Sequence, residues 1–346
     1  MPRRWFVLTL SPEPLLSIDD LRVTFAVRST FLRRTLMEVS SVAGVSLSVM
    51  PGKTLGIVGE SGCGKSTTAR AIIGLDKPSS GTITFAGERI EMASPQRRRQ
   101  LARDMQMIYQ DPFASLNPRK TVAQIIGEGW QVHPDLLHAT ERNAETALLM
   151  RKVGLDPALS DRFPHQFSGG QRQRIGIARA LALRPRLLIC DEPVSALDVS
   201  VQAQTLNLLS DLQHELGLTY VFIAHDLSVV RHVSNTIAVM YLGRIVETGA
   251  VGQIYASPAH PYTRALMSAA PIPRPWAVSR PARIVLKGEL PSPLAPPSGC
   301  RFHTRCWMAR EQCRTDEPKL REVAGRQTAC HFAEEVVATA GPVGTP

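Results

Sequence analysis

The sequence has no long hydrophobic run, few aromatic residues and no convincing export signal. A helix that crosses a bilayer needs roughly 18 predominantly apolar residues, and no stretch of the chain approaches that length. The apolar stretch Trp5–Leu10 is too short for a secretory signal, and Pro12 and Pro14 follow it closely. We therefore expect a protein that stays on the cytoplasmic side and does not itself span a membrane.

The composition excludes a wholly disordered chain, because 44% of the residues are hydrophobic and only 20% are charged. The 346 residues predict about two domains. With 40 Lys and Arg against 30 Asp and Glu, the net charge is +10. Such a charge suits nucleic acid, an acidic membrane surface or phosphate-bearing small molecules, and does not choose among them.

Proline divides the chain near residue 270, because eight prolines fall between residues 271 and 297. Such a density excludes a regular helix and favours extended or turn geometry. There is no internal repeat. We expect four segments: an N-terminal extension (1–17), a main domain (18–270), a small cysteine-containing domain (271–332) and a tail (333–346).

The main domain alternates between strand-like and helix-like patterns. Short apolar stretches predict buried strands at Thr54–Val58, Leu187–Cys190 and Tyr220–Ala224. Helical patterns follow at Thr67–Ile73 and at 201–216. This alternation favours an α/β fold with a parallel sheet covered on both faces. Residues from about 95 to 180, which include the helical stretch Glu141–Lys152, predict an inserted helical subdomain.

A phosphate-binding loop is predicted at Gly59–Ser66, which fits the pattern G-x-x-x-x-G-K-[ST]. Its glycines let backbone N–H groups surround phosphates, and Lys65 is expected to reach the β- and γ-phosphates. Ser66 is expected to bind Mg²⁺ at the start of the following helix. The nucleotide-binding residues predicted here are Gly59, Ser61, Gly62, Cys63, Gly64, Lys65, Ser66 and Thr67. The strand before the loop and the helix after it make a chance glycine-rich turn the weaker interpretation.

Two carboxylates end the second predicted strand, Asp191 and Glu192. Parallel sheets bind ligands at the carboxyl ends of their strands. Adjacent side chains on a strand point in opposite directions, so the two carboxylates can serve different roles. One is expected in the Mg²⁺ shell and the other beside the attacking water. Taken alone, such a pair is more often a solvated strand end.

A third motif, Phe167–Arg172, has small residues directly before a helix and so predicts a second anion-binding N-terminus. It resembles the signature motif of ATP-binding cassette (ABC) ATPases. The chain order is also similar to that family: phosphate loop, Gln110, signature, Asp191 and Glu192, Asp198, then His225. The resemblance covers residues 18–255.

The resemblance implies a head-to-tail dimer of two cassettes with two ATP molecules between them. It implies that Glu192 is the general base, that Asp191 and Gln110 contact Mg²⁺, and that His225 lies near the γ-phosphate. It also implies that the signature of one cassette clamps ATP bound to the other, with Asp198 coupling the two sites. The signature residues assigned to this role are Ser168, Gly169, Gly170 and Gln171. Phe25 is expected to stack on adenine, although an ordinary core phenylalanine is nearly as good an interpretation.

Several stretches are similar, more narrowly, to ATPases of bacterial dipeptide and oligopeptide importers: 109–119, 191–200, 260–263 and 288–293. This extends the resemblance to about residue 332. It implies ATP-driven peptide import with a second ATPase subunit, two transmembrane permease subunits and an extracytoplasmic peptide-binding protein. The chain would then lie at the cytoplasmic face of the membrane. Nickel, heme or glutathione remain alternative cargoes.

Four cysteines crowd the C-terminal part with the spacing C-x5-C-x6-C-x16-C: Cys300, Cys306, Cys313 and Cys330. The spacing differs from that of common zinc sites, and a reducing compartment disfavours disulfides. The residues leave open an iron–sulfur cluster, zinc with His303 or His331, and four unligated thiols. The family resemblance favours a 4Fe–4S cluster. Cys63 and Cys190 are expected to be bystanders.

The sequence suggests two other functions. The run Arg97–Arg99 with Arg103 invites a nucleic-acid interpretation, but it lacks interleaved aromatics and is more typical of a solvated helix face with some affinity for anionic lipid. We therefore expect no nucleic-acid partner, and a soluble ABC-type ATPase that acts on nucleic acid is the weaker alternative. A redox-responsive regulator is a third hypothesis, which predicts an ATPase rate that changes with the state of the cysteines.

Overall fold

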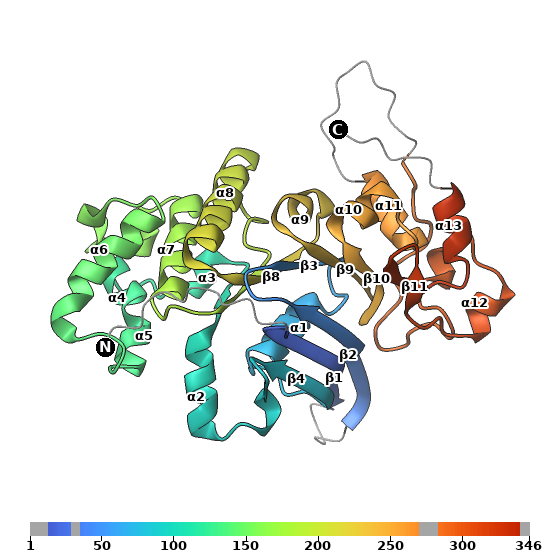
Figure 1. The fold of residues 1–346 in the computed structure, drawn as a ribbon, viewed down its shortest axis with the longest axis horizontal. Helices are drawn as coiled ribbons and strands as arrows, with labels where there is room; N and C mark the ends of the chain where they lie inside the picture. Colours follow the sequence, from blue (N-terminus) through green and yellow to red (C-terminus); the bar gives the residue numbers. More distant parts are fainter. Residues whose placement is uncertain (1–12, 29–34, 270–282, 340–346) are drawn as a thin grey trace, which may run out of the picture. The chain divides into compact units, whose positions relative to one another are not determined.

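The computed structural model describes residues 13–28, 35–269 and 283–339 (Figure 1). They form two compact units. The first comprises the described parts of Met1–Leu15, Val49–Thr54 and Ala86–Ile223, and the second those of Leu16–Ser48, Leu55–Phe85 and Ala224–Pro346. Residues 1–12 of the predicted extension and 340–346 of the tail lie outside the described residues. Among the described helices, none combines the length and the apolarity that crossing a membrane would require.

The first unit contains three parallel strands in the order β8-β7-β6. They are β6 (Met105–Ile108), β7 (Leu187–Asp191) and β8 (Thr219–Ala224). Every residue of β7 and β8 is buried, which explains their continuous apolar sequence. The predictions for both strands are confirmed to within one residue. Because the strands run the same way, their carboxyl ends meet at one edge.

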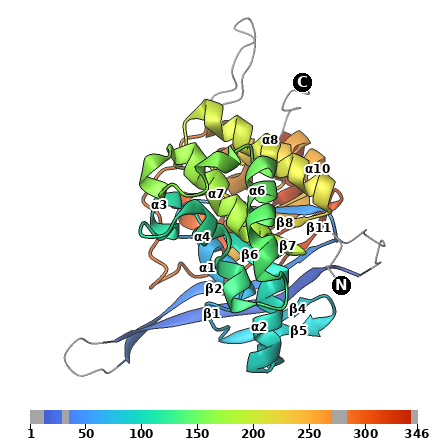
Figure 2. The same ribbon diagram turned by 90° about the vertical axis from the view of Figure 1, so that its left-hand side faces the viewer.

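Helix α7 (Gly169–Leu181) is the centre of the helical part of this unit. Helices α3 (Pro112–Ser115), α4 (Val122–Ile126) and α6 (Arg142–Lys152) pack against it (Figures 1 and 2). The buried Trp130 fixes this packing, because its indole N–H donates to the Ala182 carbonyl at 2.9 Å. The other regular elements are β5 (Glu88–Arg89), α2 (Pro95–Asp104), α5 (Glu128–Val132), α8 (Val199–Leu216) and four 3₁₀ turns, Ile90–Met92, Ala139–Glu141, Pro157–Leu159 and Pro164–Gln166.

The second unit contains a mixed sheet in the order β11-β12-β10-β9-β3. Strands β3 (Thr54–Val58) and β9 (Thr236–Tyr241) are parallel, whereas the remaining neighbours are antiparallel. The other strands are β10 (Arg244–Ala250), β11 (Arg321–Val323) and β12 (Arg326–Thr328). Its helices include α1 (Lys65–Ile72), α9 (Leu227–Val233), α10 (Val251–Ala256) and α11 (Pro261–Ala269). The predicted strand Thr54–Val58 matches β3.

A separate antiparallel sheet in the second unit was not expected from the sequence. Its order is β2-β1-β4, with β1 (Leu16–Arg28), β2 (Thr35–Val49) and β4 (Ser80–Phe85) (Figure 2). The pairing of β1 with β4 shifts register between Asp19 and Arg22. The buried residues therefore change phase, from Leu16 and Ile18 to Leu21 and Val23. This shift hides the two-residue period on which a strand prediction depends.

The C-terminal module, which we define as residues 283–339, has short elements only. They are a 3₁₀ turn (His303–Arg305), α12 (Glu311–Thr315), β11, β12 and α13 (Ala333–Thr339). Within its described residues, 283–298 contain no helix or strand, in agreement with the proline density. Strand β12 pairs with β10, and Val323 and Ala333 pack against Ala259. The module is thus joined to the rest of the second unit by a sheet and a small apolar cluster.

Candidate functional site

The phosphate-binding loop Gly59–Ser66 lies between the buried β3 and α1 in the second unit. Gly64 has φ +107°, and a Cβ there would lie 2.2 Å from the Ser41 carbonyl oxygen, so only glycine fits. The Lys65 ammonium donates to the Gly59 carbonyl at 2.8 Å and to the Glu60 carbonyl at 3.0 Å. The backbone of the loop therefore folds around the Lys65 ammonium. Helix α1 has no side-chain cap on its first turn, which is the arrangement an anion would use.

The other residues of the phosphate-binding loop differ in their exposure to solvent. Ser61 and Gly62 are exposed, whereas Ser66 and Thr67 are half-buried at the start of α1. Cys63 is buried, and its carbonyl accepts from the Gly243 N–H at 2.8 Å. Burial raises the pKa of the Cys63 thiol, although Lys65 opposes the shift. A buried neutral thiol is consistent with the expected bystander role.

Gln110 and Glu192 come together in the first unit, where β6 and β7 end side by side. The Gln110 side-chain amide donates to a Glu192 carboxylate oxygen at 3.1 Å. Asp191 is 6% exposed at the end of β7. Glu192 has φ +46°, in the left-handed region that glycine favours. The strand order thus brings three predicted residues to one edge, and one of them has an unusual backbone.

The signature motif forms the capped start of α7. Ser168 is the N-cap: its Oγ accepts from the Gln171 N–H at 3.3 Å, and the Gln171 side chain accepts from the Ser168 N–H at 3.0 Å. This reciprocal pair is a capping box. A Cβ on Gly170 would lie 2.5 Å from a Val201 methyl, so α8 approaches this turn closely. The described structure therefore gives Gln171 a local role in shaping the motif.

Asp198 caps the next helix, α8. Its carboxylate accepts from the Val201 N–H at 3.0 Å and from the Ser200 hydroxyl at 2.7 Å. These hydrogen bonds, that of Val201 first, lower the pKa of Asp198 and keep it ionised. The second unit holds the two remaining predicted residues. His225 is exposed directly after β8, and Phe25 on β1 is 39% exposed, so it is not a core residue.

The four C-terminal cysteines line one small cavity of about 10 Å³ together with Phe302. All four are free thiols. Burial raises the pKa of Cys306 to about 11 and that of Cys330 to about 12, and the neighbouring thiols reinforce both shifts. The prediction that these residues gather at one place agrees with this geometry. The neutral thiol forms of Cys306 and Cys330 are therefore favoured in the arrangement described.

This arrangement does not support the predicted 4Fe–4S cluster or a zinc site. Within the described residues, no three His, Cys, Asp or Glu side chains are grouped so that they can hold a metal ion. The His303 Nδ1 lies 2.9 Å from the Cys300 carbonyl oxygen, and the His331 Nε2 lies 3.0 Å from that of Asp316. Both imidazoles are therefore engaged with backbone carbonyls.

The arginines of α2 form ion pairs and hydrogen bonds with other residues of the first unit. Arg97 pairs with Glu88 at 2.8 Å and Arg103 with Asp135 at 2.8 Å. Arg98 donates to the carbonyls of Glu91 and Ala93, and Arg99 to that of Val132. These contacts favour a structural helix face over a nucleic-acid surface.

The sequence predicted no role for Tyr262 and Arg305, which contact the phosphate loop, or for Phe302, which packs against Tyr262. The Glu60 N–H donates to the Tyr262 hydroxyl at 2.9 Å, and Arg305 pairs with the Glu60 carboxylate. Tyr262 lies in the stretch 260–263, which predicted only a resemblance to ATPases of peptide importers and no role for this residue. No local pattern marks a residue that meets a loop more than two hundred positions away.

Comparison with known families gives two matches along the chain. The model described as "ABC transporter" matches residues 42–195, and that described as "Oligopeptide/dipeptide transporter, C-terminal region" matches residues 246–313. Among solved structures, an ATP-binding cassette dimer bound to ADP and Pi has a TM-score of 0.60 at 25% identity, over 68% of this chain and 98% of that one. The cbiO1 protein from Clostridium perfringens, part of the transporter complex cbiONQ, has a TM-score of 0.59 at 27% identity, over 70% of this chain and 90% of that one.

Curated relatives match over nearly the whole chain. The oligopeptide transport ATP-binding protein AppF of Bacillus subtilis is 51% identical, over 92% of this chain and 98% of that protein. The di/tripeptide transport ATP-binding protein DppF of Pseudomonas aeruginosa is 49% identical, over 93% and 99%. The oligopeptide transport ATP-binding protein OppF of Escherichia coli is 50% identical, over 93% and 97%.

Proposed function

Because this chain belongs to the ABC transporter family, among the oligopeptide and dipeptide transport ATP-binding proteins, we propose that it hydrolyses ATP to power peptide import. The observation that carries the proposal is the hydrogen bond of 3.1 Å between Gln110 and Glu192 at the edge where β6 and β7 end. It joins two side chains whose proposed roles concern the same water and metal ion.

Within this proposal, Glu192 accepts a proton from the attacking water, and Gln110 holds the Glu192 carboxylate in place through its amide. Lys65, Ser66 and Asp191 hold ATP and Mg²⁺ when these are bound, and Mg²⁺ then supplies charge neutralisation at the phosphates. His225 is proposed to act near the γ-phosphate. Phe25, exposed on its strand, is proposed to stack on adenine.

We propose further that two cassettes associate head to tail. Ser168, Gly169 and Gly170 of one cassette would contact ATP held by the other, because the capping box leaves the first turn of α7 rigid and rich in N–H donors. Asp198, ionised at the start of α8, would couple the two sites. The second cassette is either an identical chain or a related one.

The remaining partners are proposed from the family: two transmembrane permease subunits and an extracytoplasmic peptide-binding protein. The chain would then lie on the cytoplasmic face of the membrane as a peripheral subunit. Nickel, heme and glutathione are alternative cargoes of the same machine. The arginine contacts on α2 give a nucleic-acid function no specific support.

The finer prediction of a 4Fe–4S cluster at Cys300, Cys306, Cys313 and Cys330 is based on their spacing and on the family resemblance, and the structure adds that they line one cavity. Iron and acid-labile sulfide analysis of anaerobically purified protein tests it. Stoichiometric iron and sulfide would establish the cluster and require the thiols to move apart. Protein without iron, before and after reconstitution, would leave four thiols. No step of the proposed mechanism depends on the outcome.

Transport itself is tested by replacing the native chain in cells with Glu192→Gln and measuring uptake of labelled dipeptides, longer peptides, glutathione, heme and nickel. The matched control is Glu311→Gln, at a surface glutamate whose side chain is 82% exposed. We expect loss of peptide uptake in the first variant only. Loss of another cargo instead would correct the substrate class, and normal uptake of every cargo would contradict the proposal.

A further inference from the structure

We propose that the C-terminal module positions the phosphate-binding loop, with Arg305 and Phe302 as positioning residues that set ATP affinity. The inference rests on the proposed function, because it concerns the loop assigned to ATP. All the contacts that carry it lie within the second unit. These contacts form a chain that leads from residues 300–306 of the module, through Glu60, to the Lys65 ammonium.

The first contact is an ion pair between Arg305 and Glu60, the second residue of the loop. One guanidinium nitrogen of Arg305 lies 2.8 Å and 3.1 Å from the two carboxylate oxygens of Glu60. The Arg305 side chain is only 10% exposed and that of Glu60 27% exposed. A charge-assisted contact at such a half-buried place is stronger and more directional than a surface pair. It restrains the Glu60 side chain from the module.

The second contact restrains the Glu60 backbone. Its N–H donates to the Tyr262 hydroxyl at 2.9 Å. The Tyr262 ring packs against Phe302 of the module, with centroids 5.4 Å apart, and against Tyr241, 4.7 Å apart. All three rings are buried, with Phe302 1% exposed. Phe302 therefore fixes the ring whose hydroxyl holds the loop.

These two contacts bear on the residue assigned to the phosphates. The Lys65 ammonium donates to the Glu60 carbonyl at 3.0 Å and to the Gly59 carbonyl at 2.8 Å. A displacement of Glu60 moves one of these two acceptors. Loss of Arg305 is thus expected to displace the ammonium from the position in which it meets a phosphate, and to weaken ATP binding without touching the hydrolytic residues of the first unit.

The cysteine cavity adjoins the same stretch. Phe302 and Arg305 lie between Cys300 and Cys306, whose side chains both line that cavity, and Phe302 lines it as well. A change in packing among the thiols therefore reaches the loop through one short segment. This gives the module a physical route to the ATP site whether or not the cysteines bind a metal.

Arg305→Gln and Glu60→Gln test the pair, measured as ATP affinity by calorimetry without Mg²⁺, so that no turnover is needed. Each variant should bind ATP about tenfold more weakly, the effect of losing one charge-assisted hydrogen bond. The double variant should be no weaker than either single one, because both remove the same contact. Arg305→Lys should recover part of the affinity. In the presence of Mg²⁺, KM should rise while kcat at saturating ATP stays within about twofold.

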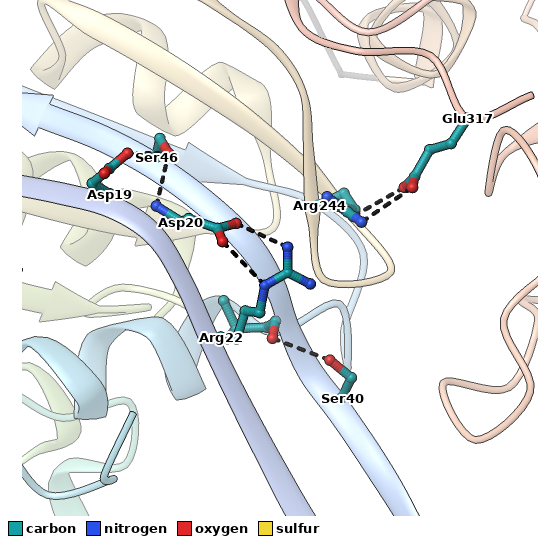
Figure 3. Close-up of polar contacts among 8 residues, drawn as sticks. Asp19, Asp20, Arg22, Ser40, Ser46, Arg244 and Glu317 are labelled. Carbon is teal, nitrogen blue, oxygen red and sulfur yellow. Dashed lines mark hydrogen bonds and ion pairs between the residues drawn. The ribbon is translucent and has the colours of Figure 1, made fainter. Parts of the chain in front are cut away.

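The matched control is Arg244→Gln. Arg244, on β10, pairs with Glu317 of the same module at 3.0 Å and 3.1 Å, and this ion pair does not include Glu60 (Figure 3). Its removal should leave ATP affinity within about twofold of wild type, since it loosens the module without releasing Glu60. Amide hydrogen exchange of residues 59–66 should accelerate in Arg305→Gln and not in Arg244→Gln.

Equal ATP affinity in wild type and Arg305→Gln would overturn the inference, as would an equal loss in Arg244→Gln. If Arg305→Gln does not fold, Glu60→Gln decides, because it leaves every contact within the module intact. The proposed function fails differently: wild-type protein would then not bind ATP, or would bind it equally well after Lys65→Ala.

Discussion

Glu192→Gly should make the protein more stable than Glu192→Ala does, and both substitutions should slow hydrolysis strongly. Glu192 has φ +46°, a backbone conformation that costs a residue with a Cβ about 1–2 kcal/mol relative to glycine. The backbone is held there by its own hydrogen bonds: its N–H donates to the Ile223 carbonyl at 3.0 Å, and its carbonyl accepts from Ser195 at 3.2 Å. These bonds persist when the side chain is removed, so glycine relieves the strain at the same backbone position.

Comparison with Glu192→Ala isolates the backbone contribution, because both variants lose the hydrogen bond from Gln110. Relief of about 1–2 kcal/mol is offset by about 0.5–1 kcal/mol of extra unfolded-state entropy for glycine. The free energy of unfolding of the glycine variant should therefore exceed that of the alanine variant, by up to about 1.5 kcal/mol. Both should hydrolyse ATP about 10²- to 10⁴-fold more slowly, the range expected when a general base is lost.

Urea denaturation without nucleotide gives the stability difference, and phosphate release at saturating ATP gives the rates. The control is the same pair of substitutions at Asn207, exposed within α8, where glycine should be less stable than alanine by about 1 kcal/mol. The difference in stability between the glycine and alanine variants should therefore have opposite signs at positions 192 and 207. A glycine variant at 192 that is no more stable than the alanine variant would refute the strain, and full turnover in either variant would refute the general base.

Three further predictions concern single side chains. Lys65→Ala should weaken ATP binding at least about tenfold in an equilibrium titration, and unchanged affinity would contradict the loop assignment. Ser168→Ala should lower the free energy of unfolding by about 1 kcal/mol through loss of the N-cap, and should abolish ATP-dependent dimers on size exclusion; dimers formed as in wild type would remove the signature from the interface. Burial lowers the pKa of His260 to about 3. The folded protein therefore keeps this imidazole neutral while the unfolded chain protonates it below about pH 6.5, so stability falls as the pH falls from there. Between pH 7 and pH 5 the free energy of unfolding should decrease by about 2 kcal/mol. Burial raises the pKa of Glu247, so its effect on stability over this pH range has the opposite sign. The contribution of His260 is isolated with His260→Gln, which should make the free energy of unfolding depend less steeply on pH than in wild type. An equally steep dependence in both proteins would count against the buried histidine.

Local sequence predicted the parallel strands and the residues that follow them. Strand β7 is uniformly apolar because it is buried on both faces, and the residues at its end are necessarily at the ligand-binding edge. The meeting of Gln110 and Glu192 follows from that rule once β6 and β7 are neighbours. Strand β1 escaped prediction for an equally local reason, since the register shift between Asp19 and Arg22 breaks the alternation on which a strand prediction depends.

Two features of the site could not be predicted in this way. The left-handed backbone of Glu192 is imposed by hydrogen bonds to Ile223 and Ser195, and glutamate carries no signal for it. The restraint on Glu60 comes from Arg305, 245 positions along the chain, and is fixed only when the C-terminal module packs. The phosphate-loop motif therefore specifies which groups meet the phosphates, while residues outside it specify where those groups lie. A chain that keeps every motif residue and loses Arg305 should bind ATP more weakly, so an intact motif is necessary for an efficient ATP site but does not by itself establish one.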